Sequence, residues 1–135
     1  MKNMTGEGDL GKLLASMSPV LIDGEFVFCS FENSRYGDHL DLEPIAAVTE
    51  SEGLTLVIPK SKADEHKLSY ESVFKGITLM VHSSLDAVGL TAAFSSKLSE
   101  HGISANVIAG YFHDHIFVQI EQAGNAIAAL DELAC

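Results

Sequence analysis

The stretch MVHSSLDAVGLTAAFSSKLSEHGISANVIAG, residues 80–110, decides the fold. It overlaps an alternating apolar run at residues 77–81, which predicts a strand, and it ends in a second apolar run at residues 103–110. Between the two runs, apolar residues recur at helical spacing, namely Ala87, Leu90, Phe94 and Leu98. The stretch therefore predicts a strand, a helix and a second strand in succession.

The predicted helix begins at Ser83 and ends at Gly102. Ser83 and Asp86 have the spacing of a capping box, in which the hydroxyl and the carboxylate each accept from a backbone N–H of the first turn. Gly102 suits the left-handed residue that follows a last helical turn. Gly89 would lie inside this helix, where glycine costs up to about 1 kcal/mol relative to alanine. Close packing of the helix on the sheet and close approach of a ligand both explain a glycine there.

The remaining segments predict an α+β protein. Apolar periodicity gives helices near residues 10–17, 61–67 and 123–134, and strands at residues 25–31, 45–50, 54–58, 105–112 and 116–120. Residues 1–70 and residues 71–135 then form two halves, each a ferredoxin-like βαββαβ unit with one edge element displaced. We expect antiparallel sheets with helices on one side, whose bare faces or edges are covered by the other half or by a second chain.

Composition excludes several classes of partner. The formal net charge of −11 disfavours nucleic acid and anionic membrane surfaces, and no apolar run is long enough to span a bilayer. The start of the chain lacks the apolar core of a secretory signal, so we expect a cytoplasmic protein. Cys29 and Cys135, the two cysteines, make neither a metal framework nor a disulfide scaffold, and no motif indicates a cofactor.

A few polar residues could carry chemistry. His113, Asp114 and His115 could contribute to a metal site, but no further ligand is fixed by spacing, and we favour a charged hairpin tip as the explanation of the cluster. His82 could be a general base, and Ser83 or Ser84 a nucleophile, but the strand-elbow motif G-x-S-x-G is absent. We therefore predict no catalytic residue and no bound metal.

The string GLTAAFSSKLSEHGISANVIAG at residues 89–110 resembles an ACT domain. SPVLIDGEFVFCSF, PIAAVTESEGLTLVIP and SYESVFKGITL in the first half resemble one branch of that family, small stand-alone bacterial proteins built of two ACT-like halves. The likeness covers about residues 9–133. ACT domains are regulatory modules with ferredoxin-like folds that commonly bind amino acids, so the resemblance implies a fold and a class of ligand rather than a reaction.

The resemblance also implies where a ligand binds. In ACT domains the ligand usually sits at the turn between the first strand and the first helix, often at an interface between two ACT units. Many members carry an Asp and a Pro-Gly in this turn, where this chain has His-Ser-Ser. The corresponding residues here are His82, Ser83, Ser84, Leu85, Asp86, Val88 and Gly89, with Asn106 from the neighbouring strand.

The leading hypothesis is a non-catalytic regulatory module that binds a small molecule, an amino acid. Backbone N–H groups at the start of the helix would bind the carboxylate, and Asp86 or Asn106 the ammonium. The side chain would meet Met80, Val88, and Phe26 or Phe28. The first alternative is a structural protein without a ligand, a homodimer formed through ACT-type sheet or helix contacts. The second is a metal-binding enzyme that uses His113 and His115.

Overall fold

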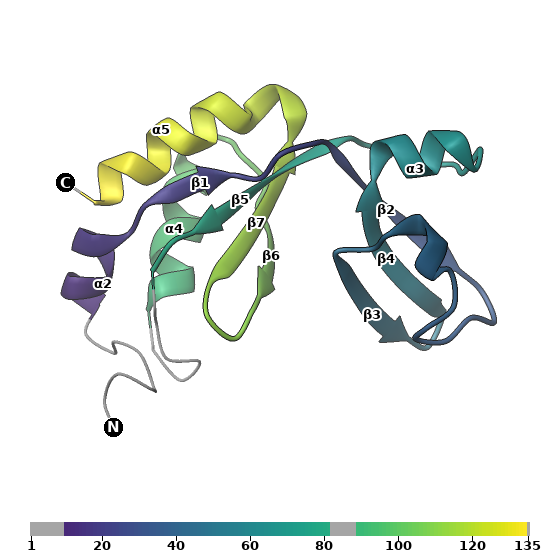
Figure 1. Cartoon of the computed structure of the whole chain (residues 1–135). Coiled ribbons are helices and arrows are strands. Elements are labelled where there is room, and N and C mark those ends of the chain that lie inside the picture. Colours follow the sequence, from purple (N-terminus) through teal and green to yellow (C-terminus); the bar gives the residue numbers. More distant parts are fainter. Residues whose placement is uncertain (1–9, 82–88, 135) are drawn as a thin grey trace. The chain divides into compact units, whose positions relative to one another are not determined.

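The chain folds into two compact units, whose strands and helices follow the alternating and helical spacing of the apolar residues. The computed structural model describes residues 10–81 and 89–134 (Figure 1). Unit 1 comprises Met1–Ile22 and Gly76–Cys135, and unit 2 comprises Asp23–Lys75. No helix within the described ranges is long and apolar enough to cross a membrane.

Unit 1 has a four-stranded sheet with the order β1-β5-β7-β6. Its strands are β1 (Pro19–Leu21), β5 (Phe74–Leu79, from Gly76 onward), β6 (Asn106–Ala109) and β7 (Asp114–Gln119). β5, α4 (Leu90–Glu100), β6, β7 and α5 (Ala123–Leu133) supply five elements of a βαββαβ unit. β1 supplies the sixth by pairing antiparallel with β5, Pro19 opposite Leu79. The prediction of a ferredoxin-like α+β fold with one displaced edge element is confirmed.

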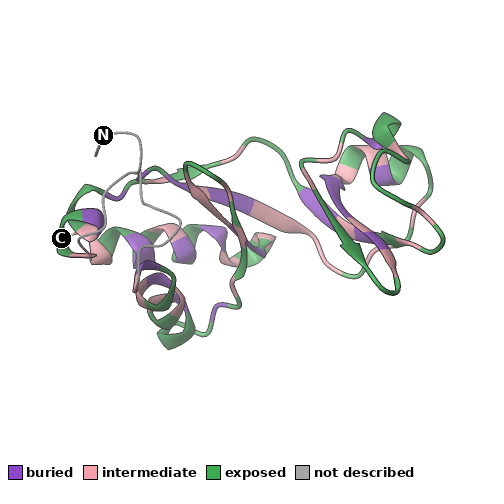
Figure 2. Cartoon of the chain, turned by 90° about the horizontal axis from the view of Figure 1, so that it is seen from below, coloured by how far each residue is buried: buried purple, intermediate pink, exposed green. Residues whose placement is uncertain are grey.

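The core of unit 1 lies between the sheet and its helices (Figure 2). Alternate residues of β5 and β7 face α4, α5 and the N-terminal helix α2 (Leu10–Ser16), with a short 3₁₀ turn η2 (Ile120–Gln122) leading into α5. The predicted stripe of α4 is buried as expected, since Leu90, Phe94 and Leu98 are at most 3% exposed. Packing of this stripe on the sheet is therefore what fixes α4 in place.

Unit 2 repeats the same arrangement with a reduced first helix. Its strands are β2 (Phe26–Phe31), β3 (Ala46–Glu50) and β4 (Gly53–Pro59), in the order β3-β4-β2, and Phe26 pairs with Phe74 at the start of β5. A 3₁₀ turn, η1 (Leu40–Leu42), stands where the first helix of the unit would be, and α3 (Lys60–Glu65) is the second. Val27, Cys29, Leu54, Leu56 and Ile58 form the core of this unit, together with Leu42 and Ala63.

The predicted hairpin of residues 45–50 and 54–58 is confirmed as β3 and β4. It turns at Gly53, whose φ of +148° and whose position both require glycine. A Cβ atom at Gly53 would lie 2.5 Å from the backbone carbonyl oxygen of Phe31. The turn thus packs so close to β2 that no residue with a Cβ atom fits at position 53 without a shift of the backbone.

The boundaries of two predicted helices differ from the structure. α4 begins at Leu90, not at Ser83, because Gly89 adopts a left-handed conformation with φ +99° that no helix interior contains. α3 begins at Lys60, directly after Pro59, and has no side-chain cap. Ser61 is therefore not its cap, and the Asp64 carboxylate accepts from Lys60 and Tyr70 instead of from the backbone.

The sequence predicts two ACT-like halves that meet between residues 70 and 71, and this division stays a prediction. In space, the segment before Ile22 packs with the C-terminal half, because β1 pairs with β5 and α2 joins the core of unit 1. A half defined by continuous sequence and a unit defined by packing are therefore different divisions of this chain.

Candidate functional site

The candidate site follows the end of β5 in unit 1. Met80 donates its backbone N–H to the carbonyl oxygen of Ser18 at 2.8 Å, and Val81 is buried, at 5% exposure. Residues 82–88 lie outside the described residues. The predictions made on this turn concern His82, Ser83, Ser84, Leu85, Asp86 and Val88. The described geometry of the site is accordingly that of the two segments beside this turn, the end of β5 and the start of α4.

The second of these segments is the start of α4. Gly89 is the residue before the helix, and because it has no side chain it gives the first turn no side-chain cap of its own. The N–H groups of Leu90, Thr91 and Ala92 fall in that first turn, where helical geometry provides no acceptor within the helix. The positive end of the helix dipole lies at the same point. The start of α4 can therefore accept an anionic group in chemical terms.

Gly89 is explained by its backbone and by its neighbour. Its φ of +99° is strained for any residue with a Cβ atom, and such an atom would lie 3.1 Å from Cδ2 of Leu10. The close approach is therefore made by α2 of the same chain. Neither explanation offered by the sequence, a helix interior packed on the sheet or contact with a ligand, is needed for this glycine.

His113 contacts the base of the turn. Its Nδ1 lies 3.1 Å from the carbonyl oxygen of Val81, and since a carbonyl only accepts, Nδ1 carries the hydrogen in this contact. Two residues further along β7, Nδ1 of His115 lies 3.0 Å from Oγ1 of Thr78. His115 thus joins β7 to β5, and His113, directly before β7, contacts the segment that follows β5. The sequence singled out these histidines for metal binding and gave no sign of this role, which depends on strand register.

The metal hypothesis gains no support from this arrangement. Within residues 10–81 and 89–134, no group of three or more His, Cys, Asp or Glu side chains could hold a metal ion. His113, Asp114 and His115 are half-buried, while Tyr111 and Phe112 form the exposed tip of the hairpin. Partial burial raises the pKa of the Asp114 carboxyl and lowers the pKa of the His115 imidazole, since it disfavours the charged forms.

Asn106 lies away from the end of β5. It pairs with Phe117, four residues along β7 from His113, which is the residue level with Val81. At about 3.3 Å per residue this separates Asn106 from the base of the turn by roughly 13 Å along the sheet. Its Nδ2 donates to the carbonyl oxygen of Phe117 at 3.2 Å. The structure therefore places Asn106 at the other end of the sheet from the end of β5.

Comparison with protein families assigns both halves of the chain. Residues 5–75 match a family described as an ACT domain, and residues 71–132 match a second family with the same description. A search among curated proteins found no match.

Solved structures carry the same fold. A protein of unknown function from Vibrio cholerae, described as a possible transport protein, is 57% identical with a TM-score of 0.86, over 93% of this chain and 96% of that one. The ligand-free regulatory subunit of aspartate kinase from Thermus thermophilus is 8% identical with a TM-score of 0.65, over 89% and 97%. Aspartate kinase from Clostridium acetobutylicum is 11% identical with a TM-score of 0.63, over 88% and 34%. The last two likenesses concern the fold alone.

Proposed function

This chain belongs to the ACT domain family and carries two tandem ACT domains, and on that premise we propose that it is a regulatory module that binds an amino acid. ACT domains are regulatory, non-catalytic modules, and a similar fold occurs in the regulatory subunit of an aspartate kinase. We place the ligand at the turn between β5 and α4 of unit 1. The predicted position of this site at an interface between ACT halves stays a prediction.

The glycine at the N-cap of α4 is the observation that carries the proposal. Gly89, the N-cap residue, has no side chain to accept from the first-turn N–H groups that follow it, and the proposal assigns these donors to the carboxylate of a ligand. Helix N-termini occur in every helical protein, and family membership is what leads us to propose this one as a ligand site. The backbone of α4 would thus recognise the carboxylate group common to all amino acids.

The turn itself would supply selectivity. In this proposal Asp86 binds the ammonium group, and His82, Ser83, Ser84, Leu85 and Val88 surround the rest of the ligand. Met80, 43% exposed at the end of β5, is a candidate apolar contact for its side chain. We leave Asn106 out of the proposed site, because β6 and β7 hold it at the far end of the sheet.

A panel of the common amino acids in thermal unfolding tests the proposal. A ligand at 100 times its Kd stabilises the folded protein by about 2.7 kcal/mol, which raises Tm by roughly 8 °C for a domain of this size. We expect Asp86→Asn to weaken the response to the effective amino acid and Asn106→Ala, the matched control, to leave it unchanged. A panel without any response would contradict the proposal and favour a structural protein.

A further inference from the structure

Unit 2 contains a hollow that the proposed function does not use. Its volume is about 570 Å³, which is within the usual range for small-molecule sites. It lies between the start of β2 and the junction of β4 with α3, and all of its lining residues belong to unit 2. The hollow is therefore formed by one unit alone.

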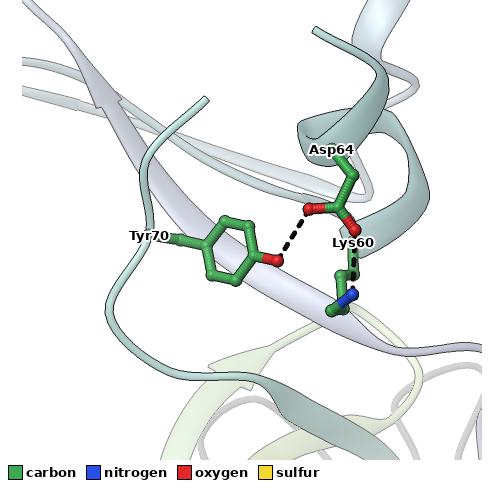
Figure 3. A network of polar contacts seen from close by, with 3 residues as sticks. All are labelled: Lys60, Asp64 and Tyr70. Atoms are coloured by element: carbon green, nitrogen blue, oxygen red, sulfur yellow. Dashed lines mark hydrogen bonds and ion pairs between the residues drawn. The ribbon is translucent and has the colours of Figure 1, made fainter. Parts of the chain in front are cut away.

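One wall of the hollow presents Lys60, held in place by Asp64. Nζ of Lys60 lies 2.8 Å from Oδ2 of Asp64, and the hydroxyl of Tyr70 donates to Oδ1 of the same carboxylate at 2.7 Å (Figure 3). Both oxygens of Asp64 are thus engaged. The hydrogen bond between them raises the pKa of Lys60 and lowers the pKa of Asp64, so both groups stay charged at neutral pH. Asp64 therefore positions the ammonium of Lys60.

A second ammonium comes from Lys75. Its Nζ donates to the carbonyl oxygen of Gly24 at 2.9 Å, which fixes the side chain at the start of β2. An ammonium group has three hydrogens, so this contact leaves two donors of Lys75 for a ligand. The whole chain has eight Lys and Arg residues against nineteen Asp and Glu. Two of these few cations meeting in one hollow indicate a place for a carboxylate.

The hollow also carries the other sign of charge close to the lysines, since Lys60 donates its backbone N–H to the carbonyl oxygen of Glu25 at 2.8 Å. Asp23 and Glu25 line the hollow and are exposed, and Phe26, which is 4% exposed, and Pro59 line it as well. Since Asp64 is occupied by Lys60 and Tyr70, the carboxylates left for a ligand are those of residues 23 and 25. A simple anion would meet these acids, and a simple cation would meet the lysines, whereas a molecule with both charges matches both kinds of group.

We propose that the hollow of unit 2 binds a small zwitterion, with its carboxylate at Lys60 and Lys75 and its ammonium at Glu25. The apolar lining residues Phe26 and Pro59 accept the carbon chain between the two charges. This site is independent of the turn between β5 and α4, because it belongs to the other unit and involves other residues. The chain thus carries a second ligand site that responds to zwitterions of suitable length.

A titration of the ¹⁵N-labelled full chain by NMR tests this inference. The probes are glycine and 4-aminobutanoate as zwitterions of two lengths, and acetate and methylammonium as single charges. We expect one zwitterion to shift the amide signals of Gly24, Glu25 and Ser61 saturably, with each single charge binding at least tenfold more weakly. Shifts at Gly89 and Leu90 report the other proposed site, so the two proposals are judged separately in the same spectra.

Matched variants identify the contacts. Lys75→Gln should weaken binding at least tenfold, and Lys75→Arg, which keeps the charge, should restore most of it. Lys62→Gln is the control, because Lys62 belongs to the same helix as Lys60 but pairs with Glu43 at 3.1 Å and does not line the hollow. Absence of shifts in unit 2, equal binding of acetate, or equal weakening by Lys62→Gln would each overturn the inference.

Discussion

Replacement of Gly89 by alanine distinguishes the structure from the simplest interpretation of the sequence, because the two predict effects of opposite sign. Inside a helix, Gly→Ala stabilises by up to about 1 kcal/mol. In the structure Gly89 precedes the helix with φ +99°, where an L-residue costs roughly 1–2 kcal/mol. The added methyl group would also lie 3.1 Å from Cδ2 of Leu10, so the Leu10 side chain must move by a few tenths of an ångström. We expect Gly89→Ala to destabilise the protein by about 1–2 kcal/mol.

Urea unfolding measures this effect. With an m-value of about 2 kcal/mol/M, the loss lowers the midpoint by roughly 0.5–1 M. Gly102→Ala is the control, because Gly102 has φ +71° with nothing within 4 Å of its Cβ position, so it reports backbone strain alone. Leu10→Ala combined with Gly89→Ala isolates the contact with α2. An unchanged or higher midpoint in Gly89→Ala would refute the reasoning and restore Gly89 to a helix interior.

Three further predictions concern stability. Gly53→Ala should destabilise the protein by at least about 2 kcal/mol, because its Cβ would lie 2.5 Å from a backbone oxygen of β2. The control Gly124→Ala on α5 meets nothing within 4 Å and should stabilise slightly, so the two variants should shift the urea midpoint in opposite directions. Phe94→Ala, at 0% exposure, should cost about 3–5 kcal/mol and Phe112→Ala, at 58%, under about 0.5 kcal/mol in the same assay; similar losses would contradict the assigned core. Burial lowers the pKa of His115 below 6.5, so the unfolded chain binds a proton at this residue more readily, and stability declines as pH falls below about 6.5. His115→Gln should reduce this decline, and an unaltered dependence of stability on pH would contradict the prediction.

The sequence predicted the fold where periodicity and burial coincide. The spacing of Leu90, Phe94 and Leu98 depends only on the geometry of a helix that covers a sheet, and all three are buried as expected. The alternation of Ile116 and Val118 likewise predicted the inner face of β7. The family resemblance was confirmed over both halves of the chain. These features need no knowledge of which strand pairs with which.

The start of α4 could not be predicted from local pattern. Ser83 and Asp86 have the spacing of a capping box, but that spacing carries no information on the conformation of Gly89 six residues later. A left-handed glycine is a common signal for the end of a helix and can equally precede one. The sequence therefore indicated that a helix is present and misplaced its first turn.

The arrangement of the site depends on contacts between distant segments. Asn106 was assigned to the ligand because its strand neighbours the first strand in the resemblance, but the register of β6 against β7 decides its level along the sheet. The contact of His113 with Val81 depends on the same register. The approach of Leu10 to Gly89 joins segments nearly eighty positions apart. None of these contacts leaves a periodic trace in the sequence.

The central claim is that the start of α4 receives the carboxylate of an amino acid, and an NMR titration that follows the amide groups of Leu90, Thr91 and Ala92 tests it most directly. The account predicts that at least one common amino acid shifts these three signals saturably, while the signal of Asn106 stays in place. If every amino acid leaves the three signals unchanged up to millimolar concentration, the claim that this helix start is a ligand site is wrong.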